Sequence, residues 1–182
     1  DPDISNNIGS TALMCAASFG REDISKLLVE NGADININDN YGRTALMSTA
    51  DQGHTSIANL LIENEADIDT KDDDGNTALM KAAWNGWKET AALLIENGAD
   101  IKAMNNRGYT PLIWTARQGH EEVASLFIDN GADINNRDTD GNTALMWTAL
   151  DETKQVAMLL IELGADIDSG NNMGKTALMM AA

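Results

Sequence analysis

The sequence contains a single cysteine, Cys15, and few basic residues. One cysteine cannot close an internal disulfide, which excludes a disulfide-rich scaffold. The 12 lysine and arginine residues stand against 29 aspartate and glutamate residues, so the formal net charge is −17 at pH 7. A field of that sign repels polyanions, and we therefore expect no nucleic-acid partner.

The sequence also lacks a long apolar run. No stretch approaches the roughly 20 apolar residues that a membrane-spanning helix needs, so we expect no membrane contact. Hydrophobic residues still make up 43% of the 182 positions, which is enough for one domain with a buried core. No signal-like segment is present, although the first residue is Asp1 rather than methionine.

What the sequence does contain is a strict internal repeat with a period of 33 residues. A Thr-Ala-Leu-Met-like tetrad and a glycine two residues before it recur in one register without insertion. The tetrads begin at Thr11, Thr44, Thr77, Thr110, Thr143 and Thr176, after Gly9, Gly42, Gly75, Gly108, Gly141 and Gly174. Self-similarity at a fixed period of this length indicates stacked repeat units.

Each unit is predicted to form a helix, a turn, a second helix and an extended loop. The threonine is a capping-type residue that opens the first helix, and Pro111 lies in the first turn, where proline is tolerated. Glycines such as Gly53 and Gly119 end this helix in a left-handed conformation. The second helix carries apolar residues at helical spacing, as in "IANLLIE". Helices this short cannot bury their apolar faces alone, so the units must be stabilised by stacking.

The full motif resembles the ankyrin repeat. It reads G-x-T-[A/P]-L, then A-A, G-H, L-L, G-A-D and a D-x-x-G turn, across essentially the whole chain. The resemblance implies an all-α solenoid of helix-turn-helix units with finger-like turns. We interpret residues 1–182 as one array of five full repeats and a partial sixth. The repeat sequence is similar to that of bacterial members of the family. Methionine or isoleucine, as at Met47 and Ile113, replaces the family's usual histidine, and we expect these side chains to pack between repeats.

Two glycine positions of the repeat hold glutamate instead. Glu65 and Glu152 stand where glycine takes a positive φ, which costs roughly 1 kcal/mol each if the geometry is kept. Both ends of the sequence fall inside a unit, because Asp1 aligns with the aspartate of G-A-D and "TALMMAA" ends within a first helix. We therefore interpret the sequence as a segment of a longer array.

The resemblance implies where a partner binds. In the ankyrin family, first helices line the concave side of the solenoid, and the turns around the recurrent glycine project beside it as fingers. At about 100° per residue, the positions four, seven and eight residues after each threonine point away from the Leu/Ala stripe. Six of the eight aromatic residues fall on these helix positions or on the fingers, where acidic and basic residues balance. The predicted partner-binding residues are Tyr41, Arg43, Lys81, Trp84, Arg107, Tyr109, Trp114, Arg117 and Trp147.

A neutral surface that carries tryptophan and arginine has the composition of an interface centre. We expect Trp84, Trp114 and Trp147 to face solvent, to form one apolar strip and to be buried by the partner. The alternative is that these indoles cover the joints between repeats and strengthen the stacking.

No motif indicates catalysis, a cofactor or a metal. The segment "NRDTDGNTALMW" from Asn136 resembles a calcium-binding loop only at its first six positions, because the twelfth is Trp147 rather than glutamate. His54 and His120 are expected to be structural, and the cysteine has no histidine near it in the repeat plan. Trp87 replaces the histidine of a Gly-His pair, and we expect it to pack rather than to bind.

The predicted function is non-catalytic recognition of another protein by a monomer without a cofactor. One alternative is a spacer or regulatory arm of a larger enzyme or effector, whose catalytic domain lies outside this segment. Another is a small molecule bound between Trp84 and Trp114.

Overall fold

The computed structural model describes residues 1–182 and confirms the all-α repeat architecture, with 11 helices and no strands. The chain forms two compact units, Asp1–Asp100 and Ile101–Ala182. The helices of the N-terminal unit are α1 (Ala12–Ser18), α2 (Glu22–Glu30), α3 (Ala45–Gln52), α4 (Thr55–Glu63), α5 (Ala78–Asn85) and α6 (Lys88–Glu96). The helices of the C-terminal unit are α7 (Pro111–Gln118), α8 (Glu121–Asp129), α9 (Ala144–Leu150), α10 (Lys154–Glu162) and α11 (Ala177–Met180).

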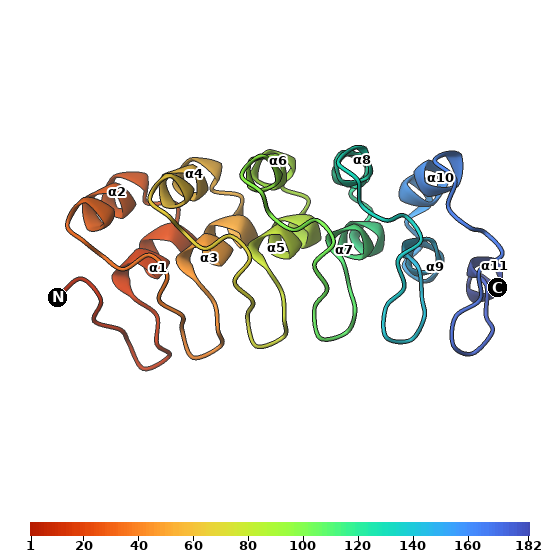
Figure 1. The fold of residues 1–182 in the computed structure, drawn as a ribbon, viewed down its shortest axis with the longest axis horizontal. Helices are drawn as coiled ribbons and strands as arrows, with labels where there is room; N and C mark the ends of the chain where they lie inside the picture. Colours follow the sequence, from red (N-terminus) through yellow and green to blue (C-terminus); the bar gives the residue numbers. More distant parts are fainter. The chain divides into compact units, whose positions relative to one another are not determined.

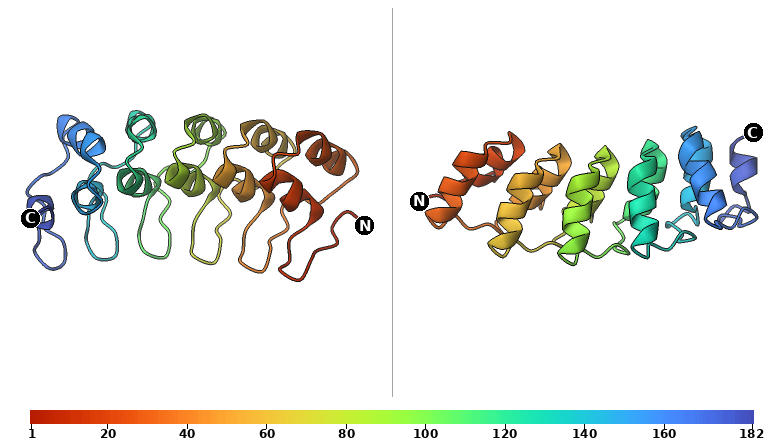
Figure 2. Two further views of the ribbon diagram at one scale, coloured as in Figure 1. Left: turned by 180° about the vertical axis from the view of Figure 1, so that it is seen from behind. Right: turned by 90° about the horizontal axis from the view of Figure 1, so that it is seen from above.

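Within each unit the helices form two layers (Figure 1). The first helices of successive repeats contact one another: α1 contacts α3 and α3 contacts α5 in one unit, and α7 contacts α9 and α9 contacts α11 in the other. The second helices form the other layer, and within each unit successive helix pairs lie side by side (Figure 2). In both units the long loops between repeats project from the layer of first helices (Figure 1). These loops are the predicted fingers.

Threonine begins every first helix, as predicted. All six threonine hydroxyls accept a hydrogen bond from the backbone N–H three residues later, which satisfies one of the N–H groups that a helix start leaves unpaired. Pro111 occupies the first turn of α7. Gly53, Gly86 and Gly119 end α3, α5 and α7 in the left-handed conformation.

The core of each repeat is built by the residues that follow the capping threonine. Leu79, Met80 and Ala83 on α5 are at most 1% exposed, as are Leu112, Ile113 and Ala116 on α7. Met80 and Ile113, at a position expected to pack between repeats, are therefore packing residues, whereas Met179 at the same position of α11 is 61% exposed. The buried threonine hydroxyls of this face are satisfied locally; Thr115, for example, donates to the carbonyl of Leu112 at 2.8 Å.

The same positions are open to solvent on α11. Leu178 is 80% exposed, whereas its counterpart Leu145 on α9 is 4% exposed. The difference arises because α9 packs against one side of α11 and no helix covers the other side. Burial of the repeat's leucine thus depends on the neighbouring repeat, which is the behaviour expected of a solenoid.

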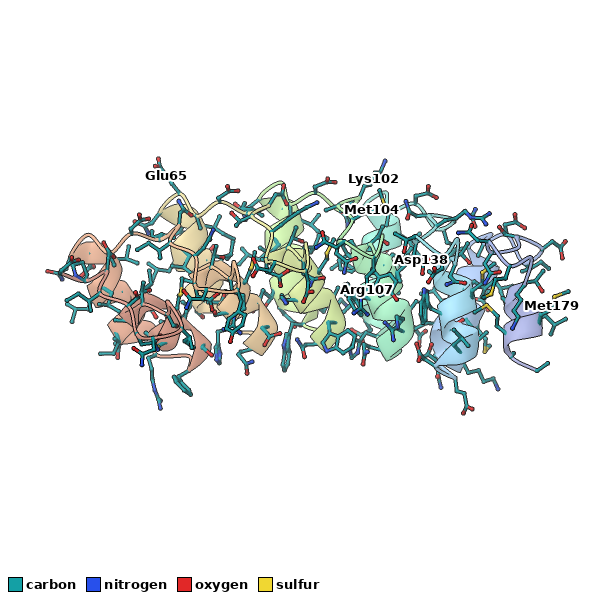
Figure 3. All side chains as sticks on the ribbon, turned by 90° about the horizontal axis from the view of Figure 1, so that it is seen from below. Glu65, Lys102, Met104, Arg107, Asp138 and Met179 are labelled. Carbon is teal, nitrogen blue, oxygen red and sulfur yellow. The ribbon has the colours of Figure 1, made fainter.

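Glu65 and Glu152 adopt positive φ values of 67° and 57°, as the repeat register predicted. The glycines at the position equivalent to Glu65, including Gly32 and Gly98, have φ values of 79° and 92°. Glu65 is exposed, and its side chain points away from the helices (Figure 3). The glutamate therefore bears the cost of the left-handed backbone without a buried contact that offsets it.

We predict that Glu65→Gly raises the free energy of unfolding by about 1 kcal/mol, because glycine adopts this φ without the clash of a Cβ atom. Urea denaturation followed by circular dichroism measures the change. The matched control is Glu30→Gly, since Glu30 ends α2 in helical geometry. This variant should have a free energy of unfolding that is lower than that of wild type by up to about 1 kcal/mol. A Glu65→Gly protein no more stable than wild type would contradict the prediction.

Candidate interaction surface

Each finger is built on one Asx residue, meaning an aspartate or an asparagine, three positions before the recurrent glycine. One oxygen of its side chain accepts two backbone N–H groups, from the residues two and four positions later; in Asp138, Oδ1 accepts from Asp140 at 2.9 Å and from Asn142 at 2.8 Å. These finger-base residues are Asn6, Asp39, Asp72, Asn105, Asp138 and Asn171; Asn6, in the first finger, is exposed, and the other five are between 5% and 9% exposed. Sequence reasoning took the D-x-x-G turn as a family signature and missed the role of its first residue.

Neighbouring fingers lie backbone to backbone. In the C-terminal unit, the N–H of Thr139 donates to the carbonyl of Arg107 at 3.1 Å, and the N–H of Asn172 donates to that of Asp140 at 3.0 Å. Arg107 and Asp138 thus come from adjacent fingers (Figure 3). A Cβ atom on Gly108, whose φ is 75°, would lie 2.8 Å from the backbone nitrogen of Thr139. Glycine is required there both for its φ and for this close approach.

Two first-helix residues that the sequence placed on the binding face contact a finger base. The ammonium group of Lys81 lies 2.7 Å from Oδ2 of Asp72. The indole N–H of Trp147 donates to Oδ2 of Asp138 at 2.8 Å. Both residues lie four positions after the capping threonine of their first helix. In these two repeats, a side chain at this helix position is therefore the donor to Oδ2 of the finger-base aspartate. The expectation that these side chains simply face outward is therefore incomplete.

Arg43 has the corresponding role within its own finger. Its Nε and Nη2 atoms lie 2.8 Å and 2.7 Å from Oδ2 of Asp39, and its guanidinium carbon lies 5.0 Å from the centroid of the Tyr41 ring. Burial raises the pKa of Asp39, but hydrogen bonds from the Arg43 side chain and from the backbone of Arg43 and Tyr41 outweigh it. The pKa of Asp39 is consequently held below its ordinary value of 3.8.

In the C-terminal unit, four predicted contact residues form one cluster. The Tyr109 ring meets the Trp114 and Trp147 rings edge-on, with centroids 4.8 Å and 5.4 Å apart. The guanidinium carbon of Arg117 lies 4.3 Å from the centroid of Trp147, and 5.4 Å from those of Tyr109 and Trp114. We call Tyr109, Trp114, Arg117 and Trp147 the aromatic–arginine cluster. Such contacts stabilise both the rings and the cation.

The exposure of the predicted residues is uneven. Trp84 is 40% exposed, Tyr41 and Arg107 are exposed, and Trp114 and Trp147 are half-buried. The expected exposure of Tyr109 is wrong, because this residue is only 6% exposed. Its ring folds from the finger onto the first helices and contacts both indoles of the cluster. Trp84 belongs to the N-terminal unit, and the cluster belongs to the C-terminal unit.

The repeat geometry agrees with a comparison of the sequence with known families. A family model of ankyrin repeats matches three times, over residues 1–72, 59–138 and 130–182. The chain belongs to the ankyrin repeat family. Ankyrin repeats are generally protein–protein interaction modules and are typically non-catalytic. No curated protein matches the sequence. None of the helices is long and apolar enough to span a membrane.

The turns between the paired helices of these ankyrin repeats are packing features. Trp87 donates its indole N–H to the carbonyl of Asp51 at 3.0 Å, and its ring covers Gly53, where a Cβ atom would lie 2.5 Å from the ring. The His54 ring packs on Gly20 in the same way, with Nε2 3.3 Å from the carbonyl of Ser18. The predicted structural roles of Trp87 and His54 are confirmed.

We predict that Trp147→Phe lowers the free energy of unfolding of the ankyrin array by about 1–3 kcal/mol. The ring is kept, but Oδ2 of buried Asp138 loses its indole donor and retains only the Asn142 amide at 3.3 Å. Urea denaturation measures the loss. In the control Trp87→Phe, the acceptor that loses its donor is the backbone carbonyl of Asp51. Asp51 is exposed, so water can hydrate this carbonyl, and the free energy of unfolding should fall by less than about 1 kcal/mol. Equal losses in the two variants would show that the buried acceptor has no special cost.

The Arg43–Asp39 pair of this array predicts a pH-dependent contribution to stability. Because the pKa of Asp39 is depressed in the folded state, the contribution is full above the unfolded value of 3.8 and is lost as the pH falls through the folded pKa. Arg43→Met should cost about 1 kcal/mol at pH 7, since the exposed part of the guanidinium is screened by water. We expect the difference from wild type, measured by urea denaturation, to shrink below pH 3.8. A difference in unfolding free energy between Arg43→Met and wild type that is the same at pH 7 and below pH 3.8 would contradict this account.

Proposed function

We propose that the chain recognises another protein through the surface formed by its first helices and fingers. The observation that carries the proposal is the aromatic–arginine cluster, in which two half-buried indoles and an arginine lie together on this surface. Tryptophan, tyrosine and arginine are the residue types that dominate binding energy at protein interfaces. Aromatic side chains that are fixed in position also lose little conformational entropy when a partner binds.

The charge distribution supports the same surface. The chain carries a net charge of −17, yet the helix and finger positions of this surface carry equal numbers of acidic and basic residues. The balance of charge removes the net repulsion that the acidic remainder of the chain exerts on acidic groups of a partner. A partner bound here therefore meets a locally neutral surface, while the acidic remainder keeps the protein dispersed.

The N-terminal unit carries equivalent positions on its own first helices and fingers. Trp84 is exposed on α5, and Ser18, Arg43, Met47, Ser48, Asp51 and Lys81 line a depression of about 100 Å³. The proposed contact residues are Tyr41, Arg43, Lys81 and Trp84 in this unit, and Arg107, Trp114, Arg117 and Trp147 in the C-terminal unit. We propose that buried Tyr109 supports the two indoles rather than touching the partner.

We predict that Trp84→Ala and Trp114→Ala each weaken partner binding by about 2 kcal/mol, which is the loss typical of a buried interface anchor. Proteins captured by the wild-type chain, but not by these variants, are identified by mass spectrometry and measured by calorimetry. The matched control is Trp87→Ala. Trp87 is exposed to about the same extent, at 41% against 40% for Trp84, but it lies in the turn that precedes α6.

The control should lower the melting temperature without weakening binding, because Trp87 packs on Gly53 and not on the proposed surface. A partner held equally well by Trp84→Ala, Trp114→Ala and wild type would overturn the proposed surface. Binding lost only in proportion to the loss of thermal stability would show that the indoles strengthen stacking instead. A spacer role for the array predicts no dependence on any of these side chains.

A further inference from the structure

We propose that Arg117 binds an aspartate or glutamate side chain of the partner, with the cluster's indoles receiving an apolar neighbour of that acid. This inference rests on the proposed function and specifies the partner's chemistry. Three features of Arg117 support it: the guanidinium is fixed in place, its outer edge is open, and its own acidic partner is the most exposed of those on this surface.

The guanidinium of Arg117 is fixed before any partner arrives. Its carbon lies 4.3 Å from the centroid of the Trp147 ring and 5.4 Å from those of Tyr109 and Trp114, and the side chain is 22% exposed. An arginine side chain otherwise carries about 2 kcal/mol of rotamer entropy that binding must suppress. Because the three rings have already restricted this side chain, an incoming carboxylate meets an ordered donor.

The outer edge of the guanidinium is the part available for binding. Arg117 contacts Asp151 through Nε, at 3.2 Å from Oδ2. A guanidinium has five N–H groups, four of them on the two η nitrogens. The structure records no acceptor for these η nitrogens. Their N–H groups form the fork that matches the two oxygens of a carboxylate.

A comparison with the other ion pairs of this surface singles out Arg117. Arg43 and Lys81 lie 2.7 Å from carboxylates whose side chains are only 3% and 5% exposed. Those two cations neutralise buried acids, and removing them would strand a buried charge. Asp151, by contrast, is 34% exposed and remains hydrated without its arginine. Of these three paired cations, Arg117 is thus the one that can bind a partner's acid at the lowest cost.

The charge of the two units favours this position for an acidic ligand. The N-terminal unit has 18 acidic and six basic residues, whereas the C-terminal unit has 11 acidic and six basic residues. Repulsion of an acidic side chain is therefore weaker at the C-terminal unit. A singly charged carboxylate is also repelled less than a doubly charged phosphate, which favours an acidic residue over a phosphorylated one.

A displayed library of random twelve-residue peptides, selected against the whole chain, tests the inference. We expect the enriched peptides to share an aspartate or glutamate next to an apolar residue. In calorimetry, Arg117→Gln should lower the affinity for a synthesised peptide at least tenfold. Arg117→Lys should lower this affinity less, because lysine keeps the charge but lacks the fork of N–H groups. The charge-matched control is Lys154→Gln on α10, which should change the affinity less than twofold.

A double-mutant cycle then identifies the contact. Replacing the peptide's acid by its amide should weaken binding to wild type at least tenfold, but should have little further effect on Arg117→Gln. The peptide-side change needs no folded variant, so an amide peptide that binds wild type as tightly as its parent overturns the inference. Peptides that require Trp114 but not Arg117 overturn the inference and leave the proposed function standing. Peptides that require neither residue, or no enriched peptide at all, overturn both.

Discussion

The finger-base hydrogen bonds are the constraint on which the rest of this surface depends. One oxygen of the finger-base aspartate or asparagine accepts two backbone N–H groups and thereby closes the turn of each finger. The closed turn sets the position of the recurrent glycine, and the glycine allows the next finger to approach within hydrogen-bonding distance. Backbone contacts between fingers therefore follow from one side-chain oxygen per repeat.

Much of the fold was predictable because the repeat forces agreement between local signals. Thr77 begins α5 and Gly86 ends it, as the residue types alone predict. The 33-residue period then determines which leucines lie in the core. Even the departures followed from register: Glu65 and Glu152 take a positive φ because they follow the ends of α4 and α9, where backbone hydrogen bonds such as Ala66 N–H to the Leu61 carbonyl and Thr153 N–H to the Thr148 carbonyl close the helix. In these cases one residue's conformation depends on short-range chemistry and on stacking of identical units.

The candidate surface was less predictable because its side chains interact across fingers and helices. A helical wheel places Trp147 away from the apolar stripe, but it gives no sign that the indole N–H reaches buried Asp138. Tyr109 occupies a finger position and still turns inward, because two tryptophans on the first helices offer its ring edge-on contacts. Such arrangements depend on which residues stand nearby in three dimensions, and the repeat motif does not encode them.

The second oxygen of the buried finger acid has a consequence for how this surface can diversify. In different repeats the donor to that oxygen is a guanidinium from Arg43, an ammonium from Lys81 or an indole from Trp147. The scaffold accepts all three, although their size, charge and polarity differ widely. A substitution that exchanges one donor for another would alter the character of the outer surface and preserve the turn beneath it. Each repeat with an aspartate at its finger base thus offers evolution or protein engineering a donor position at which specificity can change independently of the fold.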